Sequence, residues 1–265
     1  MSFNKNSVTG LGGGEPINGA FHNDLGFITR TEVGNSIAEF YGWETEGIFQ
    51  TPLEVDAYKN ESGNLIQPLA APGDFRFKDL NNDGKIDEKD KTFIGSPHPI
   101  FSGGYSLELN YANFDLMIAT EGVYGNKVFN SMNRYLMTGL GEFNSSMALY
   151  EGRWQGEGTS NTIPRVIETD PNQNWRISDR YVEDGSYLRI KNVELGYQIP
   201  TKLLSKVKIS NCRIYVSIQN LATFTKYSGI DPEIGIGKGG SLDIGIDRAT
   251  YPYSKMYIVG TSITF

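Results

Sequence analysis

The last ten residues of the chain, 256–265, alternate strictly between two kinds of side chain, and this constrains the fold more than any other feature. Successive side chains of a β-strand point to opposite faces, so alternation predicts a strand with two different surfaces. One face is almost entirely apolar or aromatic: Tyr257, Val259, Thr261, Ile263 and Phe265. The other face is smaller and becomes more polar: Met256, Ile258, Gly260, Ser262 and Thr264. The chain is therefore predicted to end on an amphipathic β-strand.

Earlier segments repeat this alternation of apolar and polar side chains. They are residues 101–111, 114–121, 193–199 and 212–219. The pair Leu188 and Ile190 is out of phase with Val193 by one residue, which predicts a β-bulge or strand end near Lys191 and Asn192. The repeated pattern predicts an all-β fold built from antiparallel strands.

The connections between these strands are of two lengths. Short links occur at Ala112-Asn113 and at about residues 200–211, whereas the long connections are 11–99, 123–185 and 225–254. Soluble domains seldom contain structureless connections longer than about 15 residues. Short turns at one end and long loops at the other are typical of outer-membrane barrels, with the turns periplasmic and the loops extracellular. Within the long connections we expect short helices in 52–60 and in 127–153.

The final strand also has the features of an outer-membrane insertion signal, because an aromatic residue closes it. We predict that this signal, together with the barrel-assembly machinery, brings the strand into outer-membrane lipid. The residues assigned to it are Tyr257, Val259, Ile263 and Phe265. An amphipathic edge strand of a soluble protein has the same pattern, so a β-sandwich stays open as an alternative at this point.

Composition restricts the classes of partner. The net charge is −7 and no basic cluster is present, so a nucleic-acid partner is not expected. Cys212 is the single cysteine, which excludes an intrachain disulfide and a cysteine-based zinc site. The sequence contains no run of about 18 apolar residues, so no transmembrane helix is predicted. Residues 1–14 lack the apolar core of a secretory signal, so we expect the chain to be a fragment of a longer protein.

Residues 79–90 follow the pattern of a calcium-binding loop within a predicted extracellular connection. Gly84 supplies the sharp turn at position six, and Ile86 is the apolar residue at position eight. The predicted oxygen ligands are Asp79, Asn81, Asp83, the carbonyl of Lys85, and Asp90. No flanking helix pair is evident, so the ion would be structural. The alternative is an acidic turn that is merely solvated.

The other motifs contain no recognisable set of catalytic residues, so the chain is predicted not to be an enzyme. The segment 235–240 matches a dinucleotide fingerprint in its glycines only, because the next predicted element is a strand and not a helix. Several aromatic residues lie in the long connections, where their rings either stack on a ligand or pack the loops together. The candidates for ligand contact are Tyr41, Trp43, Trp154 and Trp175.

Several motifs in order along the chain resemble the SusC/RagA-type TonB-dependent transporters of Bacteroidetes outer membranes. They are Ile28–Gly34, Phe40–Trp43, Gly47–Gln50, Pro72–Asp79, Ile94–Pro97, Arg180–Asn192, Gln219–Leu221, Phe224–Gly229 and Asp231–Glu233. The most specific of these is Arg180–Asn192, with the sequence Arg-Tyr-Val-Glu-Asp-Gly-Ser-Tyr-Leu-Arg-Ile-Lys-Asn.

The resemblance implies a barrel of about 22 strands with a plug in its lumen. Residues 1–265 would be a C-terminal part with about six strands, from a first strand at about residues 2–11, and would lack the plug and the TonB-contacting segment. It further implies import of glycan oligomers or peptides, a SusD-like surface lipoprotein as partner, and energy from the TonB complex. The main alternative is a secreted, calcium-stabilised β-sandwich that binds carbohydrate, and a remoter one is a β-rich hydrolase.

Overall fold

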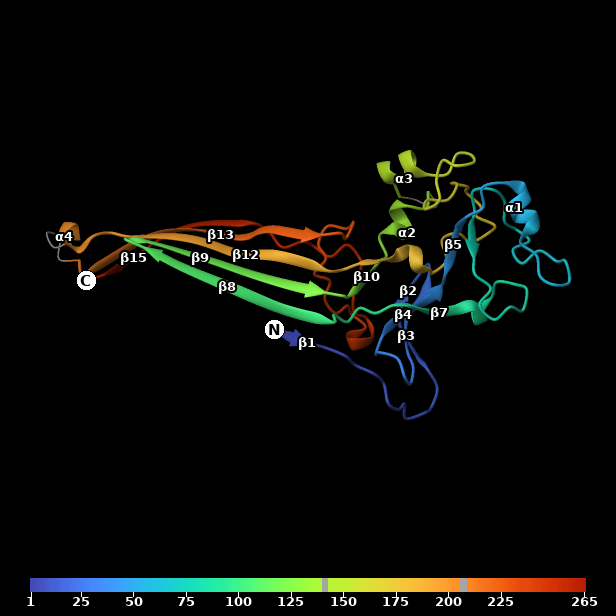
Figure 1. The fold of residues 1–265 in the computed structure, drawn as a ribbon, viewed down its shortest axis with the longest axis horizontal. Helices are drawn as coiled ribbons and strands as arrows, with labels where there is room; N and C mark the ends of the chain where they lie inside the picture. Colours follow the sequence, from blue (N-terminus) through green and yellow to red (C-terminus); the bar gives the residue numbers. More distant parts are fainter. Residues whose placement is uncertain (140–142, 205–208) are drawn as a thin grey trace.

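The computed structural model describes residues 1–139, 143–204 and 209–265 and consists of a long antiparallel sheet with a loop-rich head at one end (Figure 1). The sheet has the strand order β1-β8-β9-β12-β13-β15. Its strands are β1 (Ser2–Phe3), β8 (Phe101–Tyr111), β9 (Phe114–Tyr124), β12 (Tyr187–Gln198), β13 (Asn211–Thr225) and β15 (Met256–Thr264). Every alternating segment of the sequence lies in one of these strands, except that Ile199 and Phe265 follow the ends of β12 and β15. Those predictions are confirmed.

The first strand is much shorter than the predicted strand at residues 2–11. Only Ser2 and Phe3 pair with β8. Beyond them the backbone continues into the head, where the Val8 amide donates to the carbonyl of Asn35 at 2.8 Å and the Val8 carbonyl accepts from the Gly34 amide at 2.9 Å. Because Phe3 pairs with Phe101, the first residue of β8, residues after Phe3 run past the head end of that strand. The prediction of a long first strand is therefore wrong.

Short links close the end of the sheet that lies away from the head. The β8–β9 hairpin turns at Ala112, whose φ of 53° is left-handed. The link after β12 contains α4 (Thr201–Leu204), and its residues 205–208 lie outside the described part of the chain. The C-terminus lies at this same end, and the three long connections leave from the other end (Figure 1). The predicted asymmetry of short and long connections is confirmed.

A bulge interrupts the middle of the sheet at the predicted place. The register of β12 shifts between Ile190 and Asn192 against both β9 and β13. On β13, Asn220 opposes this irregularity with a φ of 52°, a left-handed conformation that asparagine tolerates better than most residues. The out-of-phase apolar pattern of the sequence therefore has a backbone cause.

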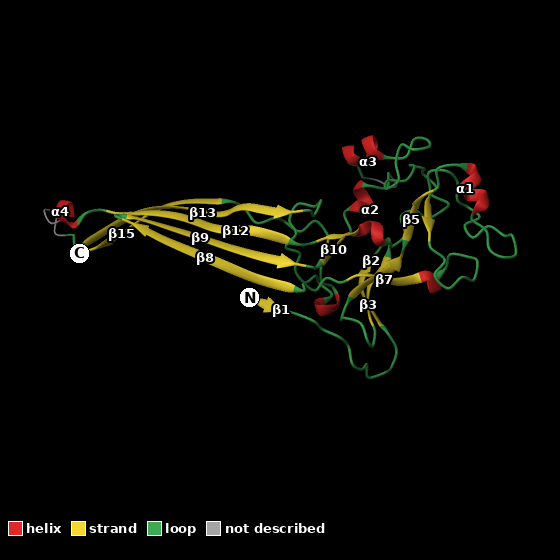
Figure 2. Cartoon of the chain, viewed as in Figure 1, coloured by secondary structure: helices red, strands yellow, loops and turns green. Residues whose placement is uncertain are grey.

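The long connections fold into small sheets and short helices and are not structureless. One sheet has the order β2 (Ile17–His22), β3 (Gly26–Thr31), β4 (Glu39–Trp43) and β7 (Lys91–Gly95). A pair forms from β5 (Thr45–Ile48) and β6 (Phe75–Phe77), and a third sheet from β11 (Val182–Asp184), β10 (Lys127–Asn130) and β14 (Ile246–Asp247). The helices of the head are α1 (Pro52–Ala57), α2 (Asn133–Leu136) and α3 (Met147–Gly152), with 3-10 turns at Glu88–Asp90, Asp179–Tyr181 and Gly240–Leu242 (Figure 2).

The predicted short helices are confirmed, and the first has a clear sequence cause. Pro52 occupies the first turn of α1, and the Thr51 hydroxyl caps it by accepting the Glu54 amide at 3.3 Å. The second predicted region contains both α2 and α3; its residues 140–142 lie outside the described part of the chain. Among the described residues, no helix is long and apolar enough to cross a membrane.

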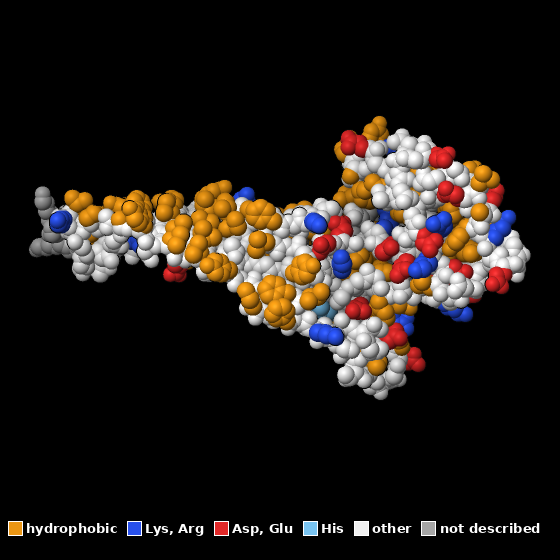
Figure 3. All heavy atoms as spheres, viewed as in Figure 1, with side chains coloured by type: hydrophobic (Ala, Val, Ile, Leu, Met, Phe, Trp, Pro, Cys, Tyr) orange, Lys and Arg blue, Asp and Glu red, His pale blue; other side chains and the backbone are white. Residues whose placement is uncertain are grey.

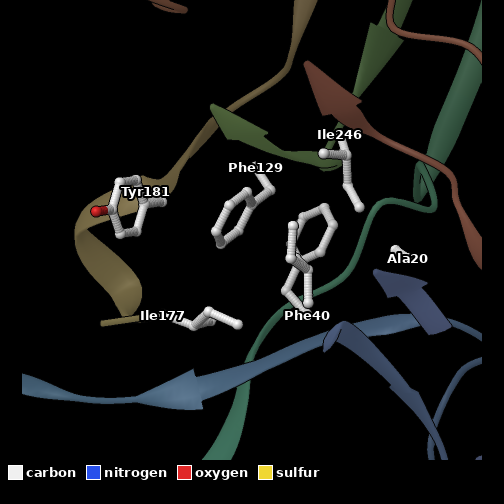
Figure 4. Close-up of a cluster of buried hydrophobic side chains, with 7 residues drawn as sticks. Ala20, Phe40, Phe129, Ile177, Tyr181 and Ile246 are labelled. Carbon is white, nitrogen blue, oxygen red and sulfur yellow. The ribbon is translucent and has the colours of Figure 1, made fainter. Parts of the chain in front are cut away.

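The hydrophobic core lies in the head and not on the six-stranded sheet. The larger cluster joins segments far apart in sequence: Ala20, Ile28, Phe40, Phe129, Ile177, Tyr181 and Ile246 (Figure 4). Within it, the Phe129 ring stacks on Tyr181 at 5.2 Å and meets Phe40 at 5.8 Å between ring centroids. A second cluster, called the Trp43 cluster below, contains Trp43, Ile48, Phe75 and Phe77. The loops thus form a packed unit that is held at one end of the sheet.

Candidate functional site

The outward face of the six-stranded sheet is a continuous apolar surface. The pairing register places one aliphatic side chain of each long strand in a single row: Leu109, Leu116, Leu195, Val216 and Val259. Figure 3 shows hydrophobic side chains gathered along this part of the molecule. Tyr257 and Val259 are 73% and 77% exposed. A β-sandwich would bury this face under a second sheet, which the described residues do not provide.

Aromatic side chains lie at both ends of this apolar face. At the turn end, Phe114 and Tyr197 pack with their ring centroids 4.7 Å apart. At the head end, Phe3 and Phe101 lie 5.1 Å apart. Membrane barrels carry such aromatic girdles where the apolar band meets each interface. The face therefore has the chemistry of a surface that contacts lipid.

The inward face carries polar and charged side chains at the alternate positions. Arg213 on β13 donates from Nε to Asp115 of β9 at 3.0 Å, and its Nη2 contacts both Asp115 and Glu194 of β12, the latter at 2.8 Å. Farther along the same face, toward the head, Lys191 pairs with Glu121 at 2.8 Å. These ion pairs join neighbouring strands on the side opposite the apolar rows, as expected for a water-facing lumen.

Arg189 forms a buried cluster at the head end of the inward face. Its Nη2 donates to Asp231 at 2.5 Å, its Nη1 to Glu233 at 2.8 Å, and its Nε to the Thr223 hydroxyl at 2.9 Å. The guanidinium also lies 5.3 Å from the ring centroids of Tyr187 and Tyr253. The sequence motifs Arg180–Asn192 and Asp231–Glu233 meet here, and the sequence predicted no role for either.

A second buried network holds the head together around Asp74. Asp74 is fully buried and accepts two hydrogen bonds from Arg165, at 2.7 and 2.9 Å, and one from Asn174 at 3.0 Å. Asn174 accepts the Phe75 amide at 2.8 Å, and Asn172 donates to the Phe75 carbonyl at 3.0 Å. Because charged and polar groups are costly to bury without partners, these bonds hold residues 165–174 against β6.

A pocket of about 340 Å³ opens beside the Trp43 cluster. Its walls include Trp43, Leu69, Pro171 and Arg176. The indole nitrogen of Trp43 donates to the carbonyl of Asp87 at 2.9 Å, which ties the pocket to the predicted calcium loop. Burial lowers the pKa of Arg176 to about 10 because its charged form is poorly solvated there. The sequence did not predict this pocket, although it gave Trp43 as a candidate for ligand contact.

The predicted ligand-contacting aromatics do not converge on one site. Trp43 and Trp154 lie together, since Trp154 packs against the Trp43 cluster and donates from its indole nitrogen to Gln50 at 3.0 Å. Tyr41 packs against Phe93, with ring centroids 5.3 Å apart. Trp175 lies under the guanidinium of Arg134, at 5.0 Å. All four pack within the head, and ligand contact stays a prediction.

The predicted calcium loop is closed by its own hydrogen bonds. Asp79 accepts the amides of Asp83 and Gly84 at 3.2 and 2.8 Å, and Asn81 accepts that of Asp83 at 2.9 Å. Fully buried Asp90 accepts the amides of Leu80 and Asp87 at 3.0 and 2.7 Å. Lys85 pairs with Asp87 at 2.6 Å, and this hydrogen bond lowers the pKa of that carboxyl.

The loop thus has the turn that the calcium pattern requires, with Gly84 at a φ of 85°. Across the described ranges, no three His, Cys, Asp or Glu side chains are grouped so that they could hold a metal ion. The carboxylates of Asp79 and Asp90 are directed at backbone amides, so an ion would have to share or displace those donors. The calcium assignment stays a prediction, for which the loop supplies the residues but not a converged ligand set.

The residues of the predicted insertion signal lie on or directly after the final strand. Tyr257, Val259 and Ile263 belong to the outward apolar face of β15, and Phe265 follows the strand with 88% of its surface exposed. β15 pairs with β13 on one side, and among the described strands it is an edge of the sheet. Recognition of these residues during membrane insertion stays a prediction.

Comparisons with known proteins identify relatives along nearly the whole chain, although no protein-family model matches it. The chain is 34% identical to TonB-dependent receptor P3 of Formosa agariphila over 236 residues, which is 88% of this chain and 22% of the relative. It is 32% identical to TonB-dependent receptor P26 of the same organism, over 100% of this chain and 26% of the relative. It is also 24% identical to the TonB-dependent receptor SusC of Bacteroides thetaiotaomicron, over 100% of this chain and 24% of the relative.

Solved structures agree with these relatives at the level of the fold. The RagAB peptide importer in its open-open state matches 99% of this chain and 26% of its own, with a TM-score of 0.69 and 23% identity. A second structure, of the RagAB peptide transporter, gives a TM-score of 0.68 with 24% identity over 94% of this chain and 24% of its own. The chain spans about a quarter of the length of the proteins that it matches.

Proposed function

The chain belongs to the SusC/RagA-type TonB-dependent receptors, as a C-terminal part of one, and we propose that it supplies barrel wall and extracellular loops to an outer-membrane transporter. Proteins of this family are transport proteins and not enzymes, so the hydrolase alternative is set aside. The whole transporter would import glycan oligomers or peptides through the barrel that these strands help to close.

One observation carries the proposal: the six-stranded sheet is apolar on its outer face and charged on its inner face. The row from Leu109 to Val259 crosses five strands without a polar side chain. On the other face, Arg213 bridges Asp115 and Glu194. Such a sheet is stable where its apolar face meets lipid and its charged face meets a wet lumen. Its unpaired edges would be closed by further strands of the same barrel.

The proposed partners follow from the family. A SusD-like surface lipoprotein would cap the barrel on the side of the head, and the TonB complex would supply energy through a part of the receptor outside this chain. The barrel-assembly machinery would insert the strands into the outer membrane. RagAB is described as a peptide importer and SusC as a TonB-dependent receptor, which supports import but leaves glycan oligomers and peptides as alternative substrates.

Fractionation and uptake test this function directly. Cells that express the receptor containing this chain would be separated into outer membrane and culture medium, and uptake of labelled glycan oligomers and peptides would be measured. We expect the receptor in the outer membrane, and uptake that is lost when either the receptor or TonB is deleted. A native protein found soluble in the medium would contradict the proposal and favour the secreted carbohydrate-binding sandwich.

A further inference from the structure

The pocket beside the Trp43 cluster contains a cation, Arg176, that forms no salt bridge with the described residues. Arg176 lies between two rings, with its guanidinium carbon 5.0 Å from the centroid of Trp43 and 4.4 Å from that of Phe77. Its Nε and Nη2 donate to the carbonyls of Gln173 and Asn172, at 3.2 and 2.9 Å. Among the described residues, no carboxylate lies within ion-pairing distance of it, and its Nη1 has no hydrogen-bond partner.

The acidic side chains that line the same pocket are already neutralised. Glu88 pairs with Lys91 at 2.7 Å, and Asp87 pairs with Lys85 at 2.6 Å. Asp170, Glu88 and Asp90 act on Arg176 only at a distance, and none of them forms a salt bridge with its guanidinium. The guanidinium can therefore pair with an anion that enters the pocket. Burial of this guanidinium is unfavourable without a counter-ion, as the lowered pKa of Arg176 also indicates.

The other walls suit the body of a ligand rather than a free ion. Leu69 is 64% exposed at the pocket, and Ile66, Pro68, Ile86 and Pro171 add apolar surface around it. Trp43 lines the pocket with only 9% of its surface exposed, beside Lys91 and Arg176, and aromatic rings pack against sugar and aliphatic surfaces alike. An arginine fixed between two rings offers a planar fork of donors, which matches the geometry of a carboxylate.

We propose that this pocket binds a carboxylate group of the imported oligomer, with Arg176 as the anion-binding residue and Leu69 and Trp43 packing against the rest of the ligand. The inference rests on the proposed transport function and narrows its substrate class to anionic oligomers. A uronic-acid glycan and a peptide with a free carboxylate share this chemistry, and the experiment distinguishes them.

Binding would be measured by calorimetry on the purified full-length receptor that contains this chain. The probes are tri-galacturonate, maltotriose as its neutral counterpart, a tripeptide with a free C-terminus, and the same tripeptide amidated. The variants are Arg176→Gln and, because that change could disturb packing, Leu69→Glu, which places a competing carboxylate at an exposed position of the pocket. Their controls are Arg76→Gln, whose guanidinium also lies near two rings but pairs with Glu46, and Leu53→Glu on α1, which is 78% exposed.

We expect at least one carboxylate probe to bind, and both pocket variants to weaken it about tenfold or more, the loss expected for one charged hydrogen bond. Neither control variant should change binding of the carboxylate probes, and Arg176→Gln should not change binding of the neutral probes. If only one of the two carboxylate probes binds, this identifies the ligand as a uronic-acid glycan or as a peptide. Equal binding of acid probes to wild type and both pocket variants would overturn the inference, as would no acid binding at millimolar concentration by a receptor that still imports. A wild-type receptor that binds the carboxylate probes but imports neither glycan oligomers nor peptides would instead contradict the transport function.

Discussion

Arg189 of β12 and Asp231 of the loop after β13 form a buried ion pair, with Nη2 and Oδ1 2.5 Å apart and side chains only 2% and 8% exposed. Two segments that are separated along the chain thus meet at the junction of sheet and head. The pair connects the last long loop to the barrel wall, and Glu233 and Thr223 complete the partners of the guanidinium. This contact gives a physical reason for the arginine and the acidic motif in the sequence.

Removing either partner should release the last loop from the wall. Arg189→Met leaves Asp231 buried without its cation, which costs about 3–5 kcal/mol for a buried pair. Asp231→Leu should have a similar effect, and the double variant should lose clearly less than the sum of the two. Urea unfolding in micelles measures the energies, and proteolysis of residues 226–255 reports release of the loop. Strict additivity would show that the two residues do not act as a pair.

The two faces of the sheet should respond oppositely to a new charge. Leu107→Arg on the outward face should destabilise the folded receptor by about 2–4 kcal/mol, the cost of a cation near the bilayer midplane. Ser106→Arg, one residue earlier on the inward face, should cost far less because its side chain meets water. Folding free energies in lipid vesicles measure both. Equal costs would argue against lipid on the outward face.

Calcium should stabilise the head if the loop at 79–90 binds it. At a calcium concentration about 100-fold above its dissociation constant, binding adds about 2.7 kcal/mol to the free energy of unfolding. Thermal unfolding would be followed with calcium and with chelator. Asp79→Asn should reduce the difference between the two conditions. Identical unfolding in both would show that the loop is a turn closed by its own amides and Lys85.

His22 of β2 contacts Tyr135 of α2, with its Nε2 3.4 Å from the Tyr135 hydroxyl oxygen, and acid should weaken this packing. Burial lowers the pKa of His22 below its usual 6.5, and nearby Asp24 only partly offsets this. The stability that depends on neutral His22 is therefore fully present above about pH 6.5 and is lost as the pH falls through the lowered pKa of the folded state. The unfolding temperature of the head should drop over that interval. His22→Gln should remove this part of the pH dependence, and an unchanged dependence would contradict the assignment.

Much of the six-stranded sheet was predictable because strand alternation is a local property. Both faces, the hairpin at Ala112 and the bulge after Ile190 follow from period-two patterning and its one-residue slip. The length of the first strand was not predictable, because it depends on the register with β8: Phe3 pairs with the first residue of that strand, and the chain then runs on into the head.

The candidate sites were less predictable because they are assembled over long distances. Asp74 meets Arg165, and Trp43 meets Arg176, only after the long connections have folded. A guanidinium without an anion is invisible in a sequence, since any of the acidic residues could have been its partner. The aromatic positions indicated the head as a place to look, but not which ring borders a pocket.

Accessibility along β8 tests the central claim that this sheet is a barrel wall. Nitroxide labels would be placed in turn at residues 105–110 of the full-length receptor in lipid, with Cys212→Ser as the background. Collision rates with oxygen report lipid, and those with a water-soluble nickel complex report the lumen. We predict high oxygen rates at Tyr105, Leu107 and Leu109, and high nickel rates at Ser106, Glu108 and Asn110. Uniform rates at all six positions, or an apolar face that meets water, would contradict the account.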